Sequence, residues 1–398
     1  MRGRVASVAA LALAAAALGG CWDRVEIQDL QVVSGVAFDA PHPGTIQVTA
    51  SIILPQNLPG AGQGGMGGAS APTTALVQAE GPTVAAALQD LTQQVPGRLF
   101  WGQTRVIVFG AAFARQGIAP VVDFFLRSRT ARLLTDLVAT PGTGRAVLEA
   151  APPLRVPGTD VLYEHLRRDV DVRAYVYQEA EAALTTADAL LLPEVAVTSP
   201  EGGGSGGGAS GGAAATSEAE PVTTLRIAGA AVLHRGRLVG WLDPTATLGA
   251  MWLNGRHHPE AVVLEVPGVG RLTLRVVRAT VRWSAWAAPP GAEVRAEVRA
   301  EGVVEEVDAG HPHLEDPRVV QAVGAAWAAA IRAEVAAAVA AARRDRVDFL
   351  GLGRAVAAHA PSAWLRLRPR WPGALPRVRV DTLVAARVLG TGNLGGAP

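Results

Sequence analysis

The sequence is poorest in cysteine and lysine. It holds a single cysteine, Cys21, so neither an intramolecular disulfide nor a metal site built from several cysteines can form. It holds no lysine, and arginine supplies all 36 basic residues. That absence argues against chemistry that depends on a Schiff-base lysine or on the lysine of a P-loop. The lone cysteine is left as a nucleophile, an inert core residue or a lipid acceptor, and its neighbours decide among the three.

An excess of charge of one sign is also missing. The 398 residues carry 36 basic and 35 acidic side chains, a net charge of +1, and such a balance offers no electrostatic case for binding nucleic acid. The tryptophans are scattered about one per expected element and are not interleaved with basic residues, which is typical of core or interface anchors. Those that support this interpretation are Trp22, Trp101, Trp241, Trp252, Trp327, Trp364 and Trp371.

Known catalytic motifs are absent: there is no P-loop, no G-x-G-x-x-G after a strand, no H-E-x-x-H and no catalytic-triad signature. Residues 203–207 (GGSGG) match G-x-S-x-G formally, but a nucleophile elbow is a strained turn that a glycine-rich linker cannot supply. Histidines cluster only at His257-His258 and His311-Pro312-His313. A metal site there would need carboxylates such as Glu260 or Glu315, so exposed loop histidines are the expected interpretation. We therefore expect no catalytic residue, no metal and no cofactor.

The first 21 residues have the layout of a lipoprotein signal peptide. Arg2 and Arg4 give a positive start, residues 5–18 form an apolar run too short to cross a membrane comfortably, and Leu18-Gly19-Gly20-Cys21 closes it. A lipoprotein signal peptidase requires small residues before a cysteine, so we predict that residues 1–20 are removed and that Cys21 is lipidated. The alternative is an ordinary secretory signal with a chance cysteine. No further run of about 18 apolar residues follows, so we expect the mature chain to lie on a membrane without crossing it.

Two glycine-rich stretches divide the mature chain. Residues 59–73 are expected to form a flexible loop within an ordered region, and residues 199–221 a Gly/Ser linker with the reach of a coil. The linker is the best domain boundary that the sequence offers. It separates an N-terminal region at 21–198 from a C-terminal domain at 222–398.

Hydrophobic periodicity predicts strands and helices in both regions. Before the linker we expect strands at 30–38 and 45–54 around a turn at Pro41–Gly44, a helix at 82–94, a strand at Gln103–Phe109, a helix at 119–127, a strand at Leu133–Ala139 and a helix at 143–150. After it we expect strands at Leu225–Leu233 and Arg237–Trp241, a helix at 244–253, long strands at Arg271–Trp283 and Ala292–Val304, and a last strand at Arg377–Val388. This irregular order predicts an α+β fold, with serial mixed α/β domains whose antiparallel-rich sheets are flanked by helices.

Two C-terminal segments have the clearest patterns. Charged and small apolar residues alternate strictly between Ala292 and Val304, as in a strand with one face in water. A long helix then starts with Asp316 as N-cap and Pro317 at its first position. Its apolar stripe is Val320, Val323, Trp327, Ile331, Val335 and Val339, and Arg343, Arg344 and Arg346 complement the helix dipole at its end.

The segment Cys21-Trp22-Asp23-Arg24-Val25-Glu26-Ile27-Gln28-Asp29-Leu30 resembles the mature start of the Ger(x)C spore germination lipoproteins, in which the lipidated cysteine runs straight into such a segment. Further blocks agree in order: 33–39, 100–103, 105–110, 114–118, 123–127 with Arg132, 229–232, 238–242, 348–354, Trp371 and 390–392. Departures from the family pattern are Gln103, where histidine is usual, Ser128 and Thr130, where acidic residues are usual, and the two glycine-rich insertions.

The resemblance implies a C subunit of a nutrient germinant receptor, made of α+β domains in series and without catalytic activity. It also implies a place on the outer face of the spore inner membrane, held by the lipid on Cys21 beside two integral membrane subunits, one of them permease-like. Two alternatives remain. An extracytoplasmic solute-binding lipoprotein would need two similar lobes, and an anchored cell-wall hydrolase would need an acid pair or a metal site.

Overall fold

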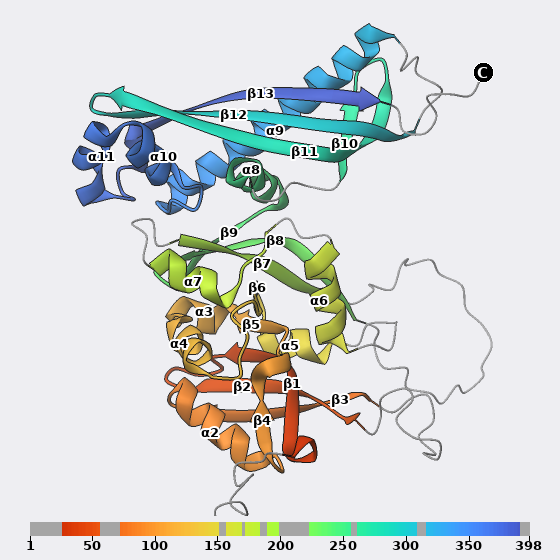
Figure 1. Cartoon of the computed structure of the whole chain (residues 1–398), viewed down its shortest axis with the longest axis vertical. Helices are drawn as coiled ribbons and strands as arrows, with labels where there is room; N and C mark the ends of the chain where they lie inside the picture. Colours follow the sequence, from red (N-terminus) through yellow and green to blue (C-terminus); the bar gives the residue numbers. More distant parts are fainter. Residues whose placement is uncertain are drawn as a thin grey trace, which may run out of the picture.

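The structure is a computed structural model that describes residues 26–55, 72–150, 157–168, 172–183, 189–198, 223–255, 261–308 and 316–390. Its strands form one sheet of nine strands and one of four, and helices pack against both (Figure 1). The first sheet mixes parallel and antiparallel pairs. The predicted α+β class is confirmed.

The nine-stranded sheet combines an antiparallel and a parallel part. In spatial order its strands are β3 (Thr74–Gly81), β2 (Ile46–Ile53), β1 (Leu30–Asp39), β5 (Val106–Gly110), β6 (Asp136–Thr140), β7 (Ala189–Thr198), β8 (Thr224–His234) and β9 (Arg237–Leu242), with β4 (Arg98–Phe100) beside the start of β1. The chain turns back between β1 and β2, and between β2 and β3, whereas β1, β5 and β6 run parallel. Every residue of β5 and β6 is buried, as expected of parallel strands covered on both faces.

Helices cover both faces of this sheet. They are α2 (Val84–Gln94), α3 (Ala111–Gln116), α4 (Ala119–Arg127), α5 (Gly144–Glu149), α6 (Gly158–Arg168) and α7 (Val176–Ala183). One apolar core lies between the sheet and α2, α3, α4 and α7, and the other lies under α5 and α6. Phe38, Phe109 and Phe113 form the aromatic centre of the first core, with ring centroids 5.8 to 6.2 Å apart.

β7, β8 and β9 form an antiparallel meander that extends the first sheet toward the second (Figure 1). β8 serves two cores, since Ala231 and Leu233 face the helices of the nine-stranded sheet while Ala230 and Val232 face the core of the four-stranded sheet. Thr198 at the end of β7 pairs with Thr224 at the start of β8. The predicted linker 199–221 therefore connects two neighbouring strands of one sheet, and the passage to the second sheet comes later, after β9. Residues 199–221 themselves lie outside the described residues, and glycine-rich composition carries no information about which strands flank them.

The four-stranded sheet is covered on one face only. Its strands, in order, are β10 (Ala261–Val266), β11 (Gly270–Ala288), β12 (Gly291–Val307) and β13 (Val378–Gly390), and its helices are α8 (Pro244–Asn254), α9 (Pro317–Asp345), α10 (Leu352–His359) and α11 (Pro361–Leu367). The predicted alternation along β12 is confirmed: Val294, Ala296 and Val298 are buried, and the charged residues between them are partly exposed. Arg295, on the open face, donates to Asp381 of β13 at 2.8 Å.

α9 is the central helix of this second half. Asp316 caps it by accepting the backbone N–H of Arg318, as predicted. By length and composition α9 could cross a membrane, but its apolar stripe, including Trp327 and Ile331, is buried in the core of the four-stranded sheet. It contacts α8 and β13 along this stripe.

Two predicted strands begin later than expected. The strand predicted at Gln103–Phe109 starts at Val106, because Trp101–Gln103 forms a 3-10 turn, η3. The strand predicted at Leu133–Ala139 starts at Asp136, because the Thr135 hydroxyl closes a turn by donating to the Arg132 carbonyl at 2.8 Å. The sequence analysis did not identify β3, β4, α3, α6, α7, β7, β10, α10 or α11.

Candidate functional site

The predicted lipidation site, Cys21, lies outside the described residues, as do Trp22 and both histidine clusters with Glu260 and Glu315. Among the described residues no group of three or more His, Cys, Asp or Glu side chains is placed to hold a metal ion. The end of the molecule that follows Cys21 is described from Glu26 onward. We therefore built the site from this end.

The described chain starts with a short 3-10 turn, η1 (Ile27–Asp29), which leads directly into β1. Gly97 fixes this turn: it has φ +99°, and a Cβ there would collide with the carbonyl oxygen of Asp29. Only glycine combines that backbone conformation with so close an approach. β4 continues the attachment by pairing in parallel with the first residues of β1. Ile27 is 86% exposed, so η1 presents a large apolar side chain to the outside.

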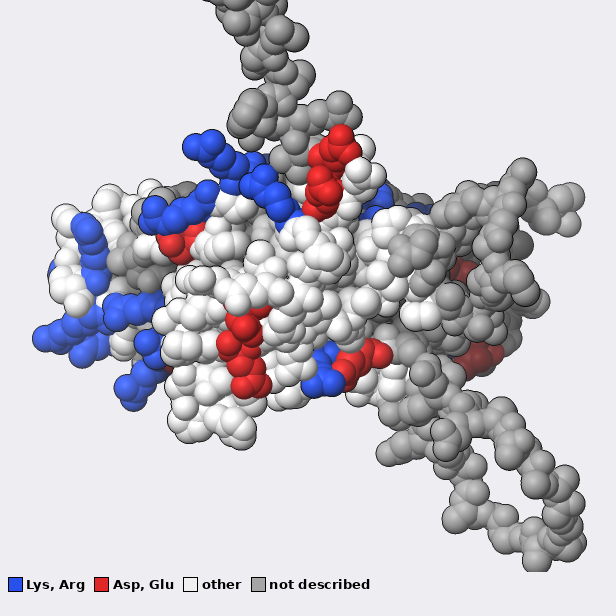
Figure 2. Space-filling model, turned by 90° about the horizontal axis from the view of Figure 1, so that it is seen from below, with Lys and Arg blue, Asp and Glu red and all other residues white. Residues whose placement is uncertain are grey.

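An open groove runs beside η1, with a volume of about 1080 Å³. Its lining is mostly apolar and includes Leu30, Ile53, Leu54, Val77 and Val95. A smaller cleft of about 380 Å³ lies on the other side of α2, between Leu88, Arg98, Trp101 and Phe124. Trp101 meets Phe124 edge-on at 5.8 Å. Figure 2 views the molecule from this end: charged residues are few in the middle, and arginines gather toward one side.

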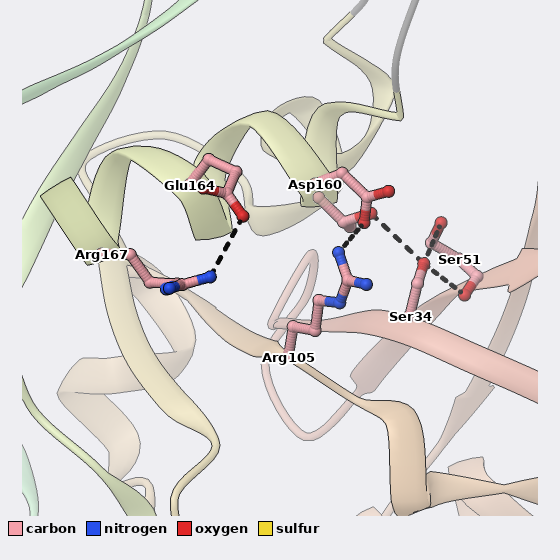
Figure 3. Close-up of polar contacts among 7 residues, drawn as sticks. Ser34, Ser51, Arg105, Asp160, Glu164 and Arg167 are labelled. Carbon is pink, nitrogen blue, oxygen red and sulfur yellow. Dashed lines mark hydrogen bonds and ion pairs between the residues drawn. The ribbon is translucent and has the colours of Figure 1, made fainter.

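A buried polar cluster anchors α6 to the sheet near this end (Figure 3). The Ser34 hydroxyl lies 3.0 Å from the Ser51 hydroxyl and 3.2 Å from that of Thr159, and all three residues are buried. Gly35 leaves room for Thr159, because a Cβ at Gly35 would lie 2.5 Å from the Thr159 methyl carbon. The three hydroxyls bond to one another across β1, β2 and α6, so the cluster links these three elements.

Arg105 holds α6 to the sheet from the surface, and a second arginine, Arg167, belongs to α6 itself (Figure 3). Arg105 forms an ion pair with Asp160 at 2.8 Å and lies over the Tyr163 ring, 5.1 Å from its centroid. Arg167 lies on the same ring at 5.9 Å and pairs with Glu164 at 3.6 Å. These contacts are partly exposed and each contributes little to stability.

Three buried aspartates hold chain segments in place. The Asp39 carboxylate accepts the backbone N–H groups of Gly144 and Arg145 at 2.7 and 2.9 Å, which caps α5. Burial raises the pKa of Asp39, and these N–H donors oppose the rise. Asp136 forms a two-bond ion pair with Arg173 at 2.7 and 3.0 Å; burial raises its pKa too, against the effect of the arginine.

Asp348 does the same in the second half of the molecule. Its carboxylate accepts the backbone N–H groups of Leu352 and Gly353, both at 2.7 Å, and the indole N–H of Trp371 at 3.2 Å. Burial raises the pKa of Asp348, again opposed by its donors. All three carboxylates have fixed structural partners, so their raised pKa values follow from burial and do not identify a general acid.

Comparisons with known proteins assign the chain to a family. Residues 23–170 match the model of the spore germination protein N-terminal domain, and residues 228–392 match the C-terminal model described as spore germination B3/GerAC like. Together they cover most of the chain. The chain belongs to this GerAC-like family of spore germination proteins, and the predicted resemblance is confirmed.

Relatives and a solved structure agree with the family. Spore germination protein KC of Bacillus subtilis (strain 168) is 23% identical over 388 residues, which cover 94% of this chain and 93% of the relative. Spore germination protein B3 of the same organism is 27% identical over 138 residues, 34% of this chain and 35% of the relative. The crystal structure of the GerBC protein is similar in fold, with a TM-score of 0.52 and 13% identity, and the match covers 89% of this chain and 97% of GerBC.

Proposed function

We propose that the chain is the lipid-anchored C subunit of a spore germinant receptor and is needed for the response of the spore to nutrients. The observation that carries this proposal is the order and extent of the two family matches, which run from residue 23 to residue 170 and from residue 228 to residue 392. Both matched models are described by spore germination. In this proposal the subunit acts by binding and assembly, without turnover of its own.

The lipid anchor rests on the sequence before the described residues. Leu18-Gly19-Gly20-Cys21 follows an apolar run, and Cys21 is the only cysteine of the chain. Only four residues lie between it and Glu26, so an anchored Cys21 would hold the η1 end within about 17 Å of the lipid. α9, the one described helix apolar enough to cross a membrane, is committed to the core, which supports an anchor at the N-terminus.

The proposed partners are integral membrane subunits of the receptor, one of them permease-like, on the extracytoplasmic face of the spore inner membrane. Names of relatives such as spore germination protein KC support a role in germination and leave these partners to experiment. Copurification of the tagged chain with membrane proteins of the spore is the direct measurement. If the chain purifies alone under mild detergent, the subunit assignment is wrong.

The anchor is tested by Cys21→Ala. We expect the variant to lose lipid labelling and to be released from the membrane fraction by a salt wash, because two acyl chains give stable anchoring that weaker surface contacts do not match. Cys21→Ser serves as a second variant, and Gly3→Ala, which leaves Leu18-Gly19-Gly20-Cys21 unchanged, is the control. Incorporation of labelled palmitate by the Cys21→Ala variant would contradict the assignment of the site.

The receptor role is tested in the organism that makes the protein. Deletion of the gene should abolish germination in response to one class of nutrient while pressure-induced germination continues. The purified chain, residues 22–398, should leave peptidoglycan intact. Degradation of peptidoglycan at an appreciable rate would favour the anchored hydrolase instead.

A further inference from the structure

Three chain segments lie together at the end of the nine-stranded sheet where its parallel strands begin. β1, β5 and β6 run parallel, and Gly35, Val106 and Asp136 lie side by side in them. The segments that lead into these strands therefore lie at the same end of the sheet. They are η1 with the start of β1, then η3, then residues 128–135. Gly102 of η3 packs against the last of these, since a Cβ there would lie 3.1 Å from the Thr130 carbonyl oxygen. Residues 128–135 thus lie at the same end of these strands as the segment that follows Cys21.

The segment 126–134, which we call the edge loop, exposes apolar side chains. Leu126 is 39% exposed, Leu133 47% and Leu134 66%. The loop is held in place: the Ser128 hydroxyl accepts the Ala131 N–H at 3.3 Å, and the Leu133 carbonyl accepts the Tyr177 N–H at 3.2 Å. Its leucines are therefore presented outward by a fixed backbone, and ordering the loop on a partner costs little entropy.

Positive charge accompanies these leucines. Residues 124–135 contain Arg127, Arg129 and Arg132 and no Asp or Glu. Arg127 is paired with Asp123 at 2.8 Å, whereas Arg129 and Arg132 are exposed and form no ion pair within the described part of the chain. Ser128 and Thr130, the residues on either side of Arg129, are uncharged, so the positive charge is not neutralised within the loop. Arg98 of β4 adds a further exposed arginine at the same edge.

We propose that the edge loop is a second membrane contact, in which Leu133 and Leu134 insert among the lipids while Arg129 and Arg132 bind anionic headgroups. The choice of a lipid surface as occupant rests on the proposed anchor: with Cys21 lipidated, Glu26 is held within about 17 Å of the bilayer, and the edge loop lies at the same end of the parallel strands. Exposed leucines next to arginines are suited to a headgroup–acyl boundary, where apolar side chains are buried and cations meet phosphates. Lipid and loop together orient the molecule, which a single point of attachment cannot do.

The first experiment measures binding of the unlipidated chain, residues 22–398, to vesicles of phosphatidylcholine with and without phosphatidylglycerol. We expect binding only with the anionic lipid. R129Q/R132Q should weaken it by about fivefold for each arginine, and L133S/L134S by roughly tenfold or more. The matched controls are R366Q/R368Q, which alter exposed arginines of α11 and the following turn, and L383S/L389S, which alter leucines of β13 that are 49% and 48% exposed.

The second experiment uses the single cysteine as a chemical tether. The chain from residue 21 onward is coupled through Cys21 to a maleimide lipid in the same vesicles, which reproduces the proposed attachment without the cell. Hydrogen exchange of residues 126–134 should then slow several-fold on anionic vesicles compared with neutral ones, while exchange in β13 stays the same. Because both experiments omit biological lipidation, failure of the proposed anchor in the organism would leave their result intact.

The outcomes distinguish a lipid surface from a protein partner as the occupant of the edge loop. Loss of vesicle binding in both loop variants with unchanged controls, at unchanged melting temperature, supports the lipid contact. Absence of vesicle binding by the wild-type chain together with unprotected loop residues on tethered vesicles overturns it. An equal loss in the controls also overturns it, because the contact then depends on general surface charge. If loop variants bind vesicles normally but lose membrane protein partners, the loop is a protein contact and the proposal is wrong.

Discussion

The two sheets differ in how many of their faces are covered. β5 and β6 of the nine-stranded sheet are buried along their whole length between two helical layers, whereas β12 of the four-stranded sheet alternates between a buried and a wet face. The first arrangement requires continuous apolar segments, and the second requires strict alternation. The comparison shows why charge is tolerated along the length of β12 and only at a few fixed positions, such as Asp39 and Asp136, in the first sheet.

The largest expected effect on stability comes from removing a core side chain of the nine-stranded sheet, which helices cover on both faces. Phe109→Ala removes a fully buried ring that packs against Phe38 and Phe113 and should lower the free energy of unfolding by about 3–5 kcal/mol. Leu383→Ala, on the open face of the other sheet and 49% exposed, should change it by less than about 0.5 kcal/mol. Denaturant unfolding of both variants checks the contrast. Equal costs would mean that the open face is covered in solution.

An effect of intermediate size on stability is expected from one buried aspartate in each half of the molecule, Asp348 and Asp39. Because the folded pKa of Asp348 lies above its ordinary value of 3.8, the folded chain binds this proton more tightly than the unfolded chain. The contribution of Asp348 to stability is therefore greatest below pH 3.8, declines as the pH rises from 3.8 to the raised pKa, and stays low above it.

Asp348→Asn removes this titration, so the melting temperature of the wild type relative to the variant should fall as the pH rises through that window. Asp39→Asn gives the matching measurement in the nine-stranded sheet, where burial also raises the pKa. A wild-type advantage that instead grows with rising pH would show that the N–H donors outweigh burial.

The smallest effect is expected from the connection between β7 and β8. Deleting residues 202–215 shortens it by about half, which should raise the free energy of unfolding by roughly 0.6 kcal/mol through a lower loop-closure cost. Since β8 contributes to both cores, the shortened chain should still unfold in a single transition. Two separate transitions would show that the linker divides independent domains, and a drop of many degrees would show that residues 202–215 are structural.

Periodicity located the elements whose burial repeats regularly. α2, α4, α8, α9 and the long strands β11 and β12 were predicted within a few residues of their bounds, and so was the cap at Asp316. Their patterns are local, so they can be found in one sequence. β8 was located equally well, but its membership of the first sheet depends on pairing with β7 across 25 intervening residues, which no local pattern encodes.

The site was less accessible to prediction. Cys21 is a local motif and remains a prediction, because the described residues begin after it. The edge loop was visible only as Ser128 and Thr130 in place of acidic residues. That its leucines are exposed follows from the turn before β6, and the sequence analysis had assigned Leu133 and Leu134 to a strand. Their apolar character alone could not distinguish a buried strand from a presented loop.

The seam between β6 and β7 has a mechanical consequence. There the two strands share one residue pair, Ala139 with Glu194, while neighbouring strands on either side pair over five residues or more. Side chains such as Leu137 and Leu192 continue the core across the seam, so its two sides are joined by apolar contact more than by backbone bonds. With a single backbone pair to break, sliding of β7 along β6 costs mainly the repacking of these side chains, so we expect relative motion of the two halves to start at this seam.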